Sequence, residues 1–216
     1  MREEDDRREI IDRFHRLYYD DAEAGGTWQA TRWLGRRALK CPLDLWVYQE
    51  IMSESHPDVI VETGTFEGGT ALFLASICDL LGHGRVITID NDPKADLPEH
   101  ERITYLHGSS TSPEMLDQVR SVAGPDASLM AVLDSAHTAE HVLGELRAYA
   151  PLVSLGGYLI VEDTNINGNP VLPDWGPGPR EAVERFLGET DAFEVDESRE
   201  KFLMTFNPKG FLKRVR

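Results

Sequence analysis

Three acidic side chains stand at the ends of two apolar segments of the sequence. Asp134 follows residues 129–133, and Glu162 and Asp163 follow residues 158–161. Each segment has the length and composition of a buried β-strand. In an open parallel α/β sheet, ligands bind outside the carboxyl ends of the strands. If these strands are neighbours, the three carboxylates crowd together, and their repulsion favours a proton or a metal ion among them.

A histidine accompanies the first of these acids. His137 lies three residues after Asp134, and His141 follows one helical turn later. Carboxylate oxygens suit Mg²⁺ or another hard divalent ion, whereas zinc sites usually contain more nitrogen or sulfur. His137 therefore has three interpretations: a metal ligand, a general base, or the start of a helix. His141 is better interpreted as structural.

A glycine-rich segment, residues 62–70, joins an apolar strand to an apolar helix. Glycines let a ligand approach the backbone closely, and the helix N-terminus offers free N–H groups. The segment lacks the dinucleotide-binding pattern Gly-x-Gly-x-x-Gly. Its acids, Glu62 and Glu67, disfavour a phosphate and fit a cationic ligand, such as the amino group of S-adenosylmethionine. The alternative is a tight turn whose glycines serve packing only.

A further acid, Asp90, closes the next apolar strand. A carboxylate at that place can accept both hydroxyls of an adenosine ribose. Nicotinamide cofactors use the same device, so Asp90 indicates a ribose and does not identify the cofactor; a simple strand-end turn is the alternative. Ser109, near the end of the third strand, is a weaker candidate to face an adenine.

From His56 onward, apolar strands alternate with helical patterns. This alternation predicts an α/β fold with a doubly wound, mostly parallel, seven-stranded Rossmann-like sheet. Residues 193–196 and 202–206 are expected to form a terminal hairpin. Residues 1–55 are expected to be an N-terminal helical extension, with an amphipathic helix over about 3–21, and residues 56–216 a cofactor-binding domain. The apolar faces of the first two helices favour a homo-oligomer.

Composition excludes several classes of function. The formal net charge of −16 argues against binding to nucleic acid backbones, and the short basic tail from Lys209 to Arg216 is expected to be a solvated terminus. No stretch approaches the length of a membrane span, and the charged N-terminus is no secretory signal. Neither Cys41 nor Cys78 has metal-ligand or redox spacing, so a cytoplasmic protein is expected.

Four segments together carry a resemblance to a known family: residues 40–50, 61–70, 132–137 and 156–164. The chain resembles the cephalosporin hydroxylase family, whose members are similar to class I S-adenosylmethionine-dependent methyltransferases, and more distantly the sugar and macrolide O-methyltransferases of antibiotic biosynthesis. The resemblance implies a methyltransferase sheet that binds S-adenosylmethionine and Mg²⁺. It also implies that Asp134, Glu162 and Asp163 are the metal ligands.

The same resemblance implies an O-methyltransferase that acts on a small secondary metabolite, either a sugar or a β-lactam-type scaffold. Asp134 and His137 are the expected catalytic residues, with His137 as proton acceptor. The expected cofactor-binding residues are Glu62, Gly64, Thr65, Gly68, Asp90 and Ser109. Trp175, in the loop of residues 164–179, is expected to form a wall of the acceptor pocket.

Three points stay open at this stage. Related metal-dependent methyltransferases often carry a lysine near the metal, and Lys40 is either that residue or a surface lysine. A nicotinamide-dependent oxidoreductase is an alternative function that Asp90 permits and the missing glycine pattern disfavours. A non-catalytic S-adenosylmethionine-binding partner subunit is the other alternative.

Overall fold

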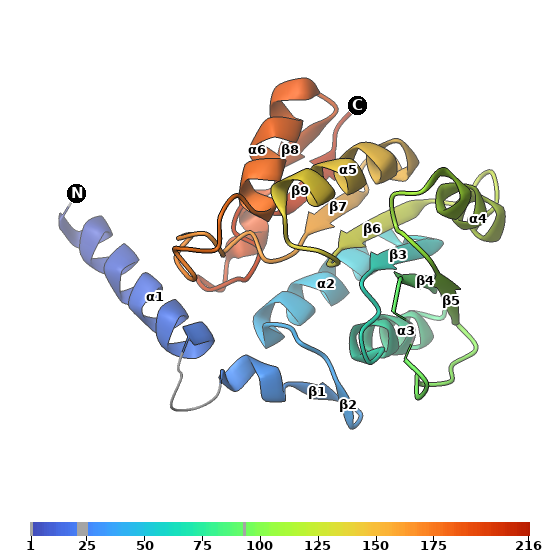
Figure 1. The fold of residues 1–216 in the computed structure, drawn as a ribbon, viewed down its shortest axis with the longest axis horizontal. Coiled ribbons are helices and arrows are strands. Elements are labelled where there is room, and N and C mark those ends of the chain that lie inside the picture. Colours follow the sequence, from blue (N-terminus) through green and yellow to red (C-terminus); the bar gives the residue numbers. More distant parts are fainter. Residues whose placement is uncertain (1, 21–25, 93) are drawn as a thin grey trace.

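A seven-stranded sheet forms the centre of the computed structural model, which describes residues 2–20, 26–92 and 94–216. The strand order is β5-β4-β3-β6-β7-β9-β8, and the first five of these strands are parallel (Figure 1). The predicted doubly wound, mostly parallel sheet is confirmed. The strands are β3 (Val59–Thr63), β4 (Arg85–Asp90), β5 (Ile103–His107), β6 (Leu129–Leu133), β7 (Tyr158–Val161), β8 (Phe193–Val195) and β9 (Phe211–Arg214).

Helices cover both faces of the sheet because alternate strand residues point to opposite sides. On one face, α2 (Pro42–Ser55) and α3 (Gly69–Leu81) pack on strand residues such as Ile60 and Val132. On the other face, α4 (Pro113–Ala123), α5 (Ala139–Tyr149) and α6 (Pro179–Glu189) pack on residues such as Val61 and Leu133. Strands buried on both faces explain why the sequence shows continuous apolar runs there.

Local signals in the sequence mark two of the helix ends. The Ser112 side chain accepts a hydrogen bond from the backbone N–H of Met115 at 3.2 Å and so caps α4. Gly82 adopts the left-handed conformation after α3, as expected of a helix terminator.

The terminal hairpin differs from its prediction. Strand β8 pairs with β9, and residues 202–206 form no strand. Met204 and Phe206 instead pack in a small apolar cluster with Cys41. The expectation of a solvated basic tail is also wrong for residues 211–214, because they form β9, which lies between β7 and β8 in the sheet. An aromatic run resembles a strand in sequence, and only long-range packing distinguishes the two.

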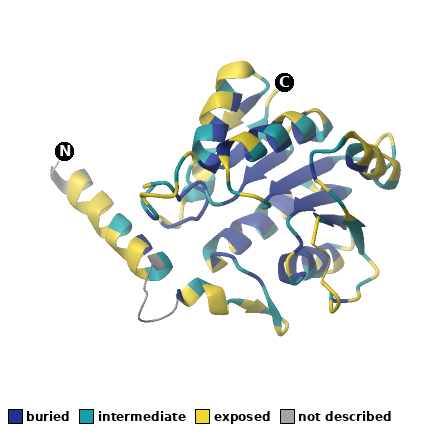
Figure 2. Ribbon diagram, in the orientation of Figure 1, coloured by how far each residue is buried: buried dark blue, intermediate teal, exposed yellow. Residues whose placement is uncertain are grey.

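The N-terminal segment lies outside the seven-stranded sheet. It contains α1 (Arg2–Asp20), the 3₁₀ turn η1 (Thr27–Ala30) and a short pair of strands, β1 (Arg32–Trp33) and β2 (Arg36–Arg37). Helix α1 projects from the body in Figure 1 and is largely exposed in Figure 2. Its last turns pack through His15, Tyr18 and Tyr19 against Phe206. Of the helices that the structure describes, none is long and apolar enough to cross a membrane.

Candidate functional site

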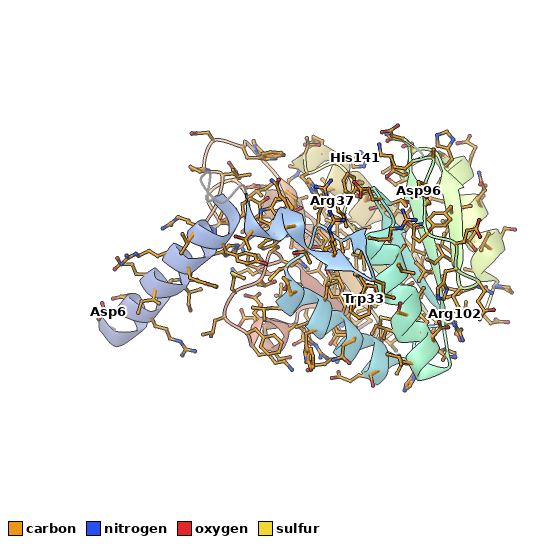
Figure 3. The ribbon with its side chains drawn as sticks, turned by 90° about the horizontal axis from the view of Figure 1, so that it is seen from below. Asp6, Trp33, Arg37, Asp96, Arg102 and His141 are labelled. Atoms are coloured by element: carbon orange, nitrogen blue, oxygen red, sulfur yellow. The ribbon has the colours of Figure 1, made fainter. Side chains whose placement is uncertain are left out.

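A cavity of about 420 Å³ opens where β3, β4, β5 and β6 end. This is the edge of the sheet that the sequence predicts for ligand binding. The loops after these strands form most of its wall, and the N-terminal segment, the end of β7 and helices α3 and α5 contribute the rest. Figure 3 labels Arg37 from β2 and His141 from α5, two of its lining residues. Expected site residues that line the cavity are Gly64, Thr65, Asp90, Ser109, Asp134, His137 and Asp163.

The loop after β3 is shaped for close approach to a ligand. Gly64 has a φ of +92° and lies against the backbone of Asp134, so a side chain has no room there. Asp90 accepts hydrogen bonds from the backbone N–H groups of Phe66, at 2.9 Å, and Asp92, at 2.8 Å. These bonds hold its carboxylate at the cavity wall, where hydroxyl donors of a ribose can reach the remaining lone pairs.

Two expected cofactor residues lie outside the cavity lining. Glu62 is fully buried, and the hydroxyl of Thr88 donates to its Oε2 at 2.5 Å. Its Oε1 has no hydrogen-bond partner among the described residues, and burial raises the pKa of Glu62 to about 8. Gly68 forms the left-handed N-cap of α3, where a Cβ would stand 2.6 Å from the Pro98 ring. Glu62 and Gly68 therefore support the glycine-rich loop without lining the cavity.

Asp134, His137 and Asp163 converge at one end of the cavity. One ligand atom from each lies within 4.8 Å of the others, and His137 Nε2 is 3.3 Å from Asp163 Oδ2. Two carboxylates and an imidazole form a donor set that fits a hard divalent cation. Burial raises the pKa of Asp163, and the neighbouring His137 opposes that shift.

The third expected ligand, Glu162, has other partners in this structure. Its side chain is 2% exposed, and its Oε1 lies 3.1 Å from Lys40 Nζ and accepts a hydrogen bond from the hydroxyl of Tyr48. The structure thus brings Asp134 and Asp163 together with His137, and it joins Glu162 to them through Lys40. The ligand set of Asp134, Glu162 and Asp163 stays a prediction.

Lys40 belongs to the site, and the surface alternative for it is wrong. Its side chain is 2% exposed and contacts both Asp134 and Glu162. Burial disfavours its charge, but the carboxylates of Asp134, Glu162 and Asp163 outweigh burial and raise the pKa of Lys40. Lys40 is therefore an ammonium. The sequence places it in an irregular segment before Pro42, where periodicity says nothing about burial.

A further buried acid near the cavity was not predicted from the sequence. Glu145 of α5 is fully buried, and its Oε1 accepts from the hydroxyls of Ser110, at 2.6 Å, and Ser135, at 2.7 Å. His141 lies 3.4 Å from the same oxygen, and that hydrogen bond raises the pKa of His141. His141 thus combines the expected structural role with a place on the cavity wall. Its i, i+4 spacing to Glu145 was the available signal.

The loop after β7 lies over the histidine. Trp175 is half exposed, and its indole N–H donates to the backbone carbonyl of His137 at 2.9 Å. It is not among the residues that line the cavity. Its ring therefore stands beside the Asp134–His137–Asp163 group and outside the cavity itself.

Comparisons with known proteins agree with this geometry. Residues 25–215 match the family described as rhamnosyl O-methyltransferase/CmcI. A rhamnosyl O-methyltransferase of Mycobacterium tuberculosis (strain ATCC 25618 / H37Rv) is 39% identical over 212 residues, which cover 95% of this chain and 85% of that protein. A rhamnosyl O-methyltransferase of Mycobacterium leprae (strain TN) is 38% identical over 214 residues, covering 95% of this chain and 90% of that protein.

Solved structures share the fold. A CmcI structure described as Mg-SAM has a TM-score of 0.68 at 24% identity, covering 87% of this chain and 78% of that chain. The MycE methyltransferase of the mycinamycin pathway, in complex with Mg, SAH and mycinamycin VI, has a TM-score of 0.50 at 22% identity, covering 66% of this chain and 40% of that chain. These likenesses identify the sheet as a Rossmann-like methyltransferase fold.

Proposed function

Because the chain belongs to the rhamnosyl O-methyltransferase/CmcI family, it is an S-adenosylmethionine-dependent O-methyltransferase, and we propose that its acceptor is a sugar hydroxyl on a small secondary metabolite. The observation that most directly supports metal-dependent methyl transfer is that Asp134, His137 and Asp163 meet at one end of the cavity that Gly64 and Asp90 also line. The residues proposed to bind the cofactor and those proposed to bind the metal thus line the same cavity.

The cofactor site of this proposal uses the glycine loop and the ends of β4 and β5. Asp90 accepts the ribose hydroxyls, and Ser109 lies beside the adenine. Gly64 and Thr65 line the cavity next to Asp134, so the methionine part of the cofactor lies towards the acids. Glu62 supports this wall indirectly, by accepting a hydrogen bond from the hydroxyl of Thr88.

The catalytic residues of this proposal are His137 and Asp134. His137 receives the proton of the acceptor hydroxyl as the methyl group passes from the sulfonium sulfur to the oxygen, and a neutral thioether leaves. Asp163, 3.3 Å from His137 Nε2, stabilises the resulting imidazolium. Asp134, Glu162 and Asp163 would hold Mg²⁺, which when bound orients the acceptor oxygen and lowers its pKa, and this ligand set leaves the imidazole of His137 free to take the proton.

The sugar is favoured over a β-lactam-type scaffold on two grounds. The curated relatives at 38% and 39% identity are named as rhamnosyl O-methyltransferases. In addition, Trp175 offers a half-exposed aromatic face beside His137, and aromatic faces suit the C–H surface of a sugar ring. Trp175 would then form the wall of the acceptor site.

The test is a methyl-transfer assay on metal-depleted protein. S-adenosylmethionine and a panel of rhamnosyl-bearing and non-glycosylated acceptors are supplied with or without MgCl₂, and products are identified by mass spectrometry. We expect methylated sugar only when Mg²⁺ is present. Methylation of a non-sugar acceptor alone would change the substrate class, and metal-independent turnover would contradict the proposed role of the acids.

Calorimetry separates the other functions. Binding of S-adenosylmethionine without binding of NADH is expected, since the glycine loop lacks the dinucleotide pattern. NADH binding would favour an oxidoreductase. Binding of cofactor and metal without turnover on any acceptor would favour a non-catalytic partner subunit.

The proposed setting is the reducing cytoplasm, in keeping with the free, buried thiols of Cys41 and Cys78. A homo-oligomer is also proposed, because Ile10, Phe14 and Leu17 expose apolar side chains along α1. Light scattering that gives the mass of a single chain would contradict the oligomer.

A further inference from the structure

A buried lysine, Lys40, forms ion pairs with two acids of the site. Lys40 Nζ contacts Asp134 Oδ2 and lies 3.1 Å from Glu162 Oε1. Asp134 is also a member of the group with His137 and Asp163 that fits a divalent cation. The Asp134 carboxylate is therefore within reach of both the Lys40 ammonium and a bound divalent cation.

Charge balance explains why an ammonium stands there. Asp134 lies at the cavity wall and Glu162 is buried behind it, and carboxylates in such places need a cation or hydrogen-bond donors close by. The hydroxyl of Tyr48 supplies one donor to Glu162, and Lys40 supplies the positive charge. Two cations at Asp134 would repel each other strongly across this poorly solvated space.

The backbone on either side of Lys40 limits how its ammonium can move away from a cation bound at Asp134. The carbonyl of Arg37 packs so closely on Gly69 that a Cβ there would stand 1.9 Å away. On the other side, Cys41 is the N-cap of α2. With the chain held at both points, the flexible part is the lysine side chain itself, whose four-carbon stem can turn its ammonium away from Asp134.

We propose that Lys40 is a built-in competitor of the divalent cation, and that its ion pair with Asp134 and Glu162 sets how tightly the site binds metal. The proposal rests on metal use by the proposed function. Binding of the cation at Asp134 requires the ammonium to withdraw from that carboxylate. The lysine thereby keeps the acids paired at low metal concentration and makes metal binding weaker than the acids alone would allow.

The test measures metal affinity directly. MnCl₂ is titrated into the metal-depleted full-length protein and followed by electron paramagnetic resonance, for wild type, Lys40→Met and Lys40→Arg. We expect Lys40→Met, which keeps the chain length without the charge, to bind Mn²⁺ at least about tenfold more tightly. Lys40→Arg should stay near wild type. The control Lys201→Met removes the same charge from an exposed pair with Glu50 and should leave the affinity unchanged.

A second measurement does not depend on the folding of a variant. In wild-type protein labelled with ¹⁵N-lysine, the Nζ resonance of Lys40 is assigned by its loss in Lys40→Arg, and MgCl₂ is added. We expect this resonance to shift as the ammonium leaves Asp134, with the midpoint of the shift matching metal binding.

The outcomes distinguish this inference from the proposed function. If wild type binds Mn²⁺ and Lys40→Met binds it equally or more weakly, or if the Nζ resonance is unmoved at saturating MgCl₂, competition is overturned while the metal-dependent function stands. If neither wild type nor Lys40→Met binds Mn²⁺, the inference and the metal role of the proposed function both fall.

Discussion

Gly64 and Asp134 lie so close together that a Cβ atom on Gly64 would stand 1.9 Å from the carbonyl oxygen of Asp134. The backbone N–H of Asp134 also donates to the carbonyl of Thr63 at 3.0 Å. The loop after β3 and the end of β6 are therefore locked together. This contact couples the glycine loop of the cofactor cavity to the position of the first candidate metal ligand.

Replacement of Gly64 by alanine tests that coupling. Gly64→Ala is expected to lower the free energy of unfolding by at least about 2 kcal/mol, because the new methyl group meets backbone that cannot give way. Gly156→Ala is the matched control, since Gly156 also has a positive φ but faces open space. Chemical denaturation of both variants isolates the clash. If both variants lose the same free energy of unfolding, only backbone strain matters at Gly64.

Removal of one acid charge tests the metal role. Asp163→Asn is expected to abolish Mg²⁺-dependent turnover and to weaken Mn²⁺ binding at least about tenfold, while the affinity for S-adenosylmethionine changes little. The control Asp126→Asn lies in the exposed turn before β6 and should behave as wild type. Retained turnover in Asp163→Asn would remove Asp163 from the metal ligands.

The proposed ribose contact is tested at Asp90. Asp90→Ala removes the acceptor at the cavity wall and is expected to weaken S-adenosylmethionine binding about tenfold to a hundredfold, as measured by calorimetry. Its backbone partners, Phe66 and Asp92, would also lose their acceptor, so circular dichroism must show that the fold is intact. Unchanged affinity in a folded variant would leave Asp90 with a loop-capping role alone.

The acceptor wall is tested at Trp175. Trp175→Ala is expected to raise KM for the acceptor about tenfold with little change in kcat or in cofactor affinity, because the ring binds the acceptor without touching the transferred methyl group. Trp46→Ala is the control, since Trp46 is an exposed residue of α2 whose indole N–H donates to the neighbouring Glu50. If both variants have the same KM, Trp175 does not contact the acceptor.

The docking of α1 is expected to depend on pH through His15. Burial against the ring of Phe206 lowers the pKa of His15 from its ordinary value of 6.5 to about 4. The folded state therefore holds a neutral imidazole, and its contribution to stability is complete above pH 6.5 and is lost as the pH falls towards 4.

Unfolding free energies at pH 7 and pH 5 measure this dependence. The difference between the two should be larger for wild type than for His15→Gln, which has no group to protonate. Equal pH dependence in the two proteins would show that His15 remains solvated when the helix docks.

The strand and helix elements were predictable because each carries a local signal. Strand β6, from Leu129 to Leu133, is apolar on both faces, and α4 begins at a serine followed by proline. The pairing of β8 was not predictable in the same way. Phe206 lies outside the sheet and packs with Cys41 and with aromatic side chains distant in sequence, such as Tyr18, whereas Phe211 begins β9.

The sequence by itself determined the sheet, its ligand-binding edge and the acids at that edge, because strand length, alternation and polar strand ends are local properties of the chain. Only the tertiary structure decided which of those acids face the cavity and which are buried behind its wall. It places His137 with Asp134 and Asp163, removes Glu62 from the cavity wall, and carries Lys40 across 94 positions of sequence to Asp134. Such contacts depend on how separate segments pack against one another, and no periodicity within either segment records them.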